Sequence, residues 1–223
     1  MCWNASISIN TYIFSTFACI FAYMNNVIEF SSVVFLQSVF IMQLFEYFVW
    51  SKTFSNRLLS QIALSIIILQ PIISILRLPR SNIYRNYLIG SYILFFSILH
   101  LVFIPFNKID FRTIPYKNGH LAWYWVPSNE IVFIWAIFSI IPSLLLGLYR
   151  STIIASILFI LTFLFYSDTK TWGSLWCWAA NIIGFTLIFD VFWKDFCTIP
   201  NYPNIFKNLR SIFSSKISLD FVR

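Results

Sequence analysis

The feature that most constrains this chain is a series of long apolar runs that contain almost no charge. The first run, Ala5 to Met24, holds no Asp, Glu, Lys or Arg, and similar runs recur along most of the 223 residues. A helical membrane span needs about 20 predominantly apolar residues. Charged residues make up 10% of the chain, whereas a soluble domain carries about 25%. The sequence therefore excludes an ordinary soluble protein and predicts an integral membrane protein.

Seven apolar runs predict an all-α, polytopic membrane protein with about seven transmembrane helices. The first run lacks a basic leader, which favours a retained signal anchor over a cleaved peptide. The predicted domains are a seven-span bundle over residues 1–194 and a basic cytoplasmic tail over residues 195–223. The predicted spans are Ala5–Met24, Phe30–Trp50, Leu58–Leu76, Tyr87–Phe106, Ile131–Leu148, Ser151–Ser167 and Thr171–Trp193.

The distribution of basic residues predicts the orientation of the chain. With seven spans the two termini lie on opposite sides, and the side of the C-terminus has nine Lys and Arg residues against six. The positive-inside rule then places the C-terminus in the cytoplasm. Basic residues stand between apolar runs and form no patch, which argues against a nucleic-acid partner. The expected partner is the lipid bilayer, with a small molecule or ion as a further ligand, and the oligomeric state stays open.

Polar side chains inside the predicted spans are candidates for a functional site, because ionisable groups are unfavourable in hydrocarbon. In the second span Glu46 shares a helix face with Gln43 and Trp50. The functional interpretation is a proton, cation or ligand site; the alternative is hydrogen bonding that only holds helices together. Five residues from four spans form the candidate site: Glu46, Gln43, Gln70, His100 and Asn181.

Two local patterns in the spans predict helix geometry and pairing. Pro71 has no backbone N–H and frees the carbonyl of Ile67, so a kink is expected there. Asp190 lies four residues before Lys194, a spacing that predicts an ion pair along one helix.

Aromatic residues gather at two places near the predicted membrane surface. The loop Gly119–Trp125 is predicted to fold as a cap on the outer surface or as a re-entrant segment, with His120, Trp123 and Trp125 as candidate residues. Such a cap would close a pocket over the Glu46 end of the second span. In the seventh run, polar and aromatic residues from Ser174 to Asn181 recur at spacings of three and four, which predicts one stripe along a helix.

The sequence predicts no metal site and no cofactor. A zinc site needs at least three protein ligands, and the chain has two histidines, His100 and His120, in separate segments. Its four cysteines form no C-x-x-C pair. A retinal protein would need a lysine within the last span, which this chain lacks.

Several local patterns occur in a fixed order over nearly the whole chain. They are Met1-Cys2-Trp3-Asn4 with Ser6, Gln43-Leu44-Phe45-Glu46-Tyr47 with Trp50, Gln70-Pro71, Gly119-His120-Leu121 with Trp123 and Trp125, and Gly173-Ser174-Leu175-Trp176-Cys177-Trp178 with Asn181. Together they resemble a family of uncharacterised multi-pass membrane proteins of giant DNA viruses and some protists. The resemblance implies a host-cell or virion membrane protein of unknown activity, and it assigns no catalytic residue.

Three functions follow from these patterns as hypotheses. The first is a helical bundle that handles a small solute, an ion or a signal through its polar intramembrane site. The second is a structural membrane protein of a virion or a replication compartment. The third is a membrane-embedded enzyme acting on lipid, with Glu46 or His100 as acid or base, although the sequence contains no evident nucleophile–base pair.

Overall fold

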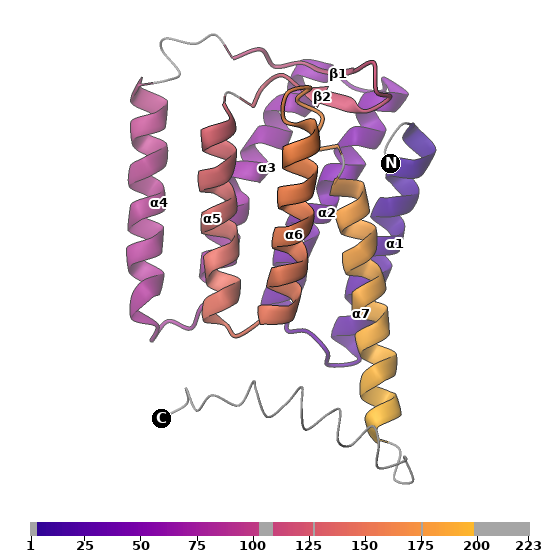
Figure 1. The fold of residues 1–223 in the computed structure, drawn as a ribbon, viewed down its shortest axis with the longest axis vertical. Helices are drawn as coiled ribbons and strands as arrows, with labels where there is room; N and C mark the ends of the chain where they lie inside the picture. Colours follow the sequence, from indigo (N-terminus) through magenta and orange to yellow (C-terminus); the bar gives the residue numbers. More distant parts are fainter. Residues whose placement is uncertain (1–3, 103–108, 127, 175, 199–223) are drawn as a thin grey trace.

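A computed structural model describes residues 4–102, 109–126, 128–174 and 176–198. Within these residues seven helices stand side by side and nearly parallel, and a two-stranded antiparallel hairpin lies across one end of them (Figure 1). The elements are α1 (Ala5–Met24), α2 (Phe30–Ser51), α3 (Asn56–Leu76), α4 (Ile83–Val102), β1 (Thr113–Pro115), β2 (Leu121–Trp123), α5 (Asn129–Leu145), α6 (Tyr149–Tyr166) and α7 (Trp176–Thr198). The predicted helical fold class is confirmed, with the small hairpin as an addition.

Three of the described helices are long and apolar enough to cross a membrane, namely α1, α2 and α3. Two shorter apolar helical segments, Asn129–Leu145 and Thr152–Tyr166, stand beside them. These helices support insertion of the chain into a membrane. Helix α7 continues past residue 194, and residues 199–223 of the predicted tail lie outside the described part of the chain.

Helix α1 packs against α2 and α7 through a face of small side chains. The buried residues of α1 recur at helical spacing and are Ser8, Thr11, Ser15, Ala18, Cys19 and Ala22. Small residues let helix backbones approach closely in a membrane. On the facing helix α7, a Cβ added at Gly184 would lie 2.8 Å from Cε1 of Phe14 on α1. The close packing of α7 against α1 therefore requires a glycine at this position.

The proline in α3 provides an attachment point for a neighbouring helix. The carbonyl of Ile67, which Pro71 leaves without its helical donor, accepts a hydrogen bond from Nε1 of Trp135 on α5 at 3.0 Å. One residue further, the hydroxyl of Tyr92 on α4 donates to the carbonyl of Ile68 at 2.7 Å. The freed carbonyl that the sequence predicts thus becomes a bond between α3 and α5.

The predicted start of the seventh span is wrong. Helix α7 begins at Trp176, and the residues from Thr171 to Ser174 form a turn before it. Ser174 therefore does not share a helix face with Asn181, and the stripe predicted from their spacing does not exist as such. Gly173 and Ser174 interrupt the apolar residues of this run for only two positions, which is too short a break for hydropathy to mark the start of the helix.

The predicted ion pair within the last helix is also wrong. Asp190 accepts a hydrogen bond from Arg150 of α6 at 2.7 Å, and Lys194 donates instead to the carbonyl of Asn25 at 2.8 Å. Because α7 packs against α6 and α1, Asp190 pairs with Arg150 and Lys194 with Asn25, although Asp190 and Lys194 are only one helical turn apart.

Candidate functional site

Glu46 is the buried ionisable residue at the centre of the candidate site. It lies in the last two turns of α2, at the end of the bundle covered by the hairpin, and only 2% of it is exposed. Gln43, one turn before it, is 1% exposed and lies on the same face. The helical spacing that the sequence contains therefore turns both polar groups into the bundle.

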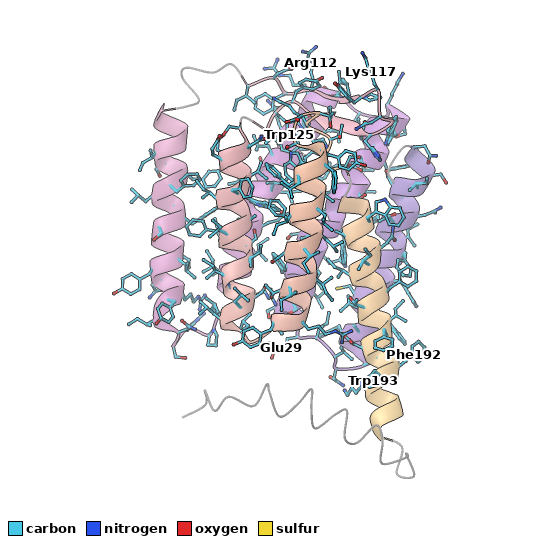
Figure 2. The ribbon with its side chains drawn as sticks, viewed as in Figure 1. Glu29, Arg112, Lys117, Trp125, Phe192 and Trp193 are labelled. Carbon is cyan, nitrogen blue, oxygen red and sulfur yellow. The ribbon has the colours of Figure 1, made fainter. Side chains whose placement is uncertain are left out.

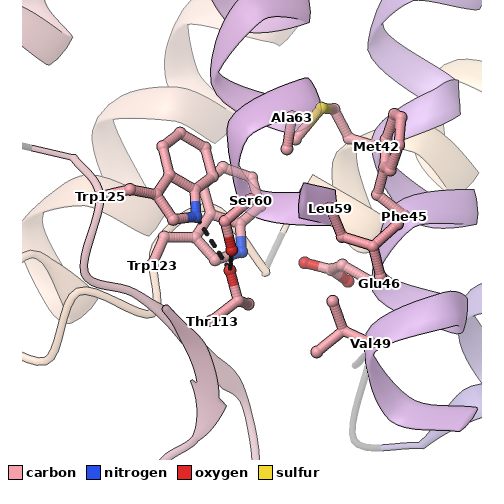
Figure 3. A pocket seen from close by; sticks show the side chains of 10 residues that line it. All are labelled: Met42, Phe45, Glu46, Val49, Leu59, Ser60, Ala63, Thr113, Trp123 and Trp125. Atoms are coloured by element: carbon pink, nitrogen blue, oxygen red, sulfur yellow. Dashed lines mark hydrogen bonds between the residues drawn. The ribbon is translucent and has the colours of Figure 1, made fainter. Parts of the chain in front are cut away.

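The hairpin belongs to a loop, residues 109–126, that covers Glu46; we call this loop the cap. Figure 3 shows the carboxyl group of Glu46 among side chains of α2, α3 and the cap. They surround a cavity of about 10 Å³, near the lower limit for one water molecule. Its polar lining comes from Glu46, Ser60, Thr113, Trp123 and Trp125.

Two polar side chains, from parts of the chain that are far apart in sequence, lie beside the carboxyl group of Glu46. These are the hydroxyl of Ser174 in the turn before α7 and the indole of Trp123 in the cap. The backbone N–H of Leu121 donates to the Ser174 hydroxyl oxygen at 3.4 Å, so the Ser174 hydroxyl keeps its own proton to donate. A tryptophan N–H only donates, so both neighbours of the Glu46 carboxyl group are hydrogen-bond donors by chemistry.

Thr113 fastens the cap to α3 beside the same cavity. Its hydroxyl lies 2.8 Å from that of Ser60 and accepts a hydrogen bond from Nε1 of Trp125 at 2.9 Å (Figure 3). The side chain of Asn56 completes the attachment, because its amide donates to the Thr113 carbonyl at 2.6 Å while its oxygen accepts from the Thr113 N–H at 2.9 Å. The side chain of Asn56 thus pairs with both the N–H and the carbonyl of Thr113, as the backbone of a neighbouring strand would.

The two tryptophans of the cap form a stacked pair with ring centroids 5.0 Å apart. A missing side chain at Gly173 makes room for one of them, since a Cβ there would lie 2.2 Å from Cζ3 of Trp123. The backbone N–H of Trp123 donates to the carbonyl of Lys170 at 3.0 Å. The turn before α7 therefore determines both the position of the Trp123 ring and that of the Ser174 hydroxyl.

His120 is buried within the cap, with 4% exposed, and does not line the Glu46 cavity. Its ring lies edge-on to Tyr166 of α6, with centroids 6.1 Å apart. Burial of the imidazole lowers the pKa of His120 below its ordinary value. His120 is therefore a packing residue of the cap whose charged form is disfavoured.

Two of the candidate residues pair with other helices, away from Glu46. The amide of Gln70 on α3 donates to the carbonyl of Ser38 on α2 at 2.7 Å. Asn181 on α7 donates to the hydroxyl of Thr11 on α1 at 3.0 Å. Neither residue lines the cavity, and the side chain of His100 lies outside the described part of the chain.

The hydroxyl and amide groups that complete the site could not be predicted from the sequence. Ser60, Thr113 and Asn56 are ordinary residues in a chain rich in Ser, Thr and Asn, and more than 50 residues separate the two sides of each contact. Gly173 is the one residue whose type hinted at the site. A glycine among bulky aromatic residues indicates that another side chain packs closely against its backbone.

Comparisons with protein-family models, curated proteins and solved structures find no match to this chain. The resemblance to membrane proteins of giant viruses stays a prediction, and the function has to be argued from the site itself.

Proposed function

We propose that this chain is a seven-span membrane protein that handles protons through the carboxyl group of Glu46. The observation that carries the proposal is a buried carboxyl group beside a cavity with room for about one water molecule. Ionisable side chains within membrane spans are rare and mark proton and ion pathways.

The size and lining of the cavity favour a proton over other ligands. Pockets for organic molecules have volumes of about 300–1,000 Å³, far above the 10 Å³ found here. Glu46 is the one ionisable residue among those that line the cavity, so no second carboxylate is present to share a divalent cation. The hydroxyls of Ser60 and Thr113 suit a water molecule, through which a carboxyl group exchanges its proton.

The lengths of the remaining helices support seven spans. Helices α4 and α7 are 20 and 23 residues long and stand alongside α1, α2 and α3 (Figure 1). Helices α5 and α6, with 17 and 18 residues, extend about 26 Å at 1.5 Å per residue, against a hydrocarbon thickness of about 30 Å.

A structural membrane protein is the second candidate. It is favoured by the bonds of Gln70 to Ser38 and of Asn181 to Thr11, which join helices away from the cavity. Under this alternative the contacts of Glu46 with Ser174 and Trp123 only fasten the cap.

Proton flux into liposomes tests the proposal. The purified protein would be reconstituted with a pH-sensitive dye inside the vesicles, and a pH step would be applied across the membrane. Glu46→Gln keeps the shape of the side chain but removes its exchangeable carboxyl proton, so we expect flux to fall roughly tenfold or more. The thermal unfolding temperature should stay close to that of the unaltered protein.

A matched control is Glu130→Gln, which removes a carboxyl group from an exposed position at the same end of the bundle. This variant should conduct as the unaltered protein does. Flux through the unaltered protein no faster than through empty liposomes would contradict the proposal and favour the structural alternative.

A further inference from the structure

Arg77 lies at the end of the bundle opposite the cap, where α3 ends. Its side chain reaches two neighbouring helices: Nη2 donates to the hydroxyl of Ser32 on α2, and Nη1 donates to that of Ser143 on α5, each at 3.1 Å. The guanidinium carbon is 5.0 Å from the ring centroid of Phe35 on α2. Arg77 is therefore held in a defined position between three helices.

The charge of Arg77 has no anionic partner in contact with it among the described residues. Its Nε is buried and meets no acceptor there, and the ion pairs in the described ranges join other residues. Glu29, labelled at this end in Figure 2, attracts the charge of Arg77 electrostatically but forms no ion pair with it. A guanidinium group stays protonated in proteins, so burial cannot neutralise it as it can a carboxyl group.

The segment around Arg77 adds further positive charge. Arg80 and Arg85 follow within the connection to α4 and its first turn, and no acidic residue lies between Arg77 and Arg85. Arg80 is exposed. The two serine hydroxyls account for one N–H of each terminal nitrogen of Arg77, which leaves the second N–H of Nη1 and of Nη2 for an oxyanion.

We propose that Arg77 binds the phosphate group of an anionic lipid headgroup, with Arg80 as a second positive charge. Arginine presents a planar fork of donors that matches phosphate oxygens. Basic pockets between membrane helices on the cytoplasmic side recognise such headgroups, and this end of the bundle is the cytoplasmic end in the predicted orientation. The site is separate from Glu46 and does not rest on a role in proton handling.

Lipid binding to the full-length protein tests this site. The protein in a neutral detergent would be titrated with short-chain phosphatidylglycerol, with short-chain phosphatidylcholine and with inorganic phosphate, and binding would be followed by native mass spectrometry and by the unfolding temperature. We expect phosphatidylglycerol to bind about tenfold more tightly than phosphatidylcholine, because net negative charge is required. Arg77→Gln should remove this preference, and Arg77→Lys should restore only part of it because the fork is lost.

The matched control is Lys52→Gln, which removes an exposed positive charge at the cap end and should leave the preference unchanged. If Arg77→Gln does not fold, Arg80→Gln changes an exposed residue and should weaken phosphatidylglycerol binding several-fold. Equal binding of the two lipids to the unaltered protein would overturn the proposal. An equal effect of inorganic phosphate would overturn the assignment to a lipid.

Discussion

At Gly173 the absence of a side chain decides where the Trp123 ring lies. A Cβ at this position would overlap the ring, with Cζ3 2.2 Å away. Because Trp123 and Glu46 line the same cavity, a shift of the ring would disturb the cap and the surroundings of the carboxyl group together. The geometry of the site thus depends on a residue that contributes no functional group of its own.

We therefore expect Gly173→Ala to destabilise the protein by about 1–3 kcal/mol, the usual effect of overpacking a filled interior. Thermal unfolding and hydrogen exchange of the cap measure the change. Gly90→Ala on α4 is the matched control, since no atom lies within 4 Å of a Cβ built there. Similar unfolding temperatures for the two variants would contradict a close fit of Trp123 against Gly173.

The cap is the element whose stability should depend on pH. Burial lowers the pKa of His120 below its ordinary value of about 6.5, so the opened cap binds a proton more readily than the closed cap. The stabilisation is complete above about pH 6.5 and decreases as the pH falls toward the pKa of the closed cap. Acidification should therefore increase hydrogen exchange in β1 and β2, after correction for intrinsic rates.

His120→Gln removes this titration and should give a cap whose protection no longer changes between about pH 8 and pH 5. A dependence that persists in the variant would assign the effect to another group of the site, such as Glu46.

For the whole molecule, the proposed seven spans place the cap and the connection between α3 and α4 on opposite sides of the membrane. Helix α4 is the one element that separates them in sequence. In a variant without the native cysteines, Lys117→Cys should react with an impermeant maleimide in intact cells, whereas Ser81→Cys should react only after permeabilisation. Labelling of both positions in intact cells would show that α4 does not cross.

The sequence by itself determined that the chain forms long apolar helices and where most of them lie, because hydrophobic content is a local property. The predicted and observed first helix both run from Ala5 to Met24. The polar face of Glu46 and Gln43 and the carbonyl freed by Pro71 also follow from spacing or from one residue's covalent structure.

Only the tertiary structure decided which polar groups meet. Gln70 and Asn181 have the same kinds of side chain as residues of the site, yet the rotation and packing of their helices pair them with Ser38 and Thr11. Glu46 instead meets residues from the cap and from the turn before α7, over separations in the chain that no local pattern encodes. A hydrogen bond requires its two atoms within about 3 Å, and helix packing alone sets that distance.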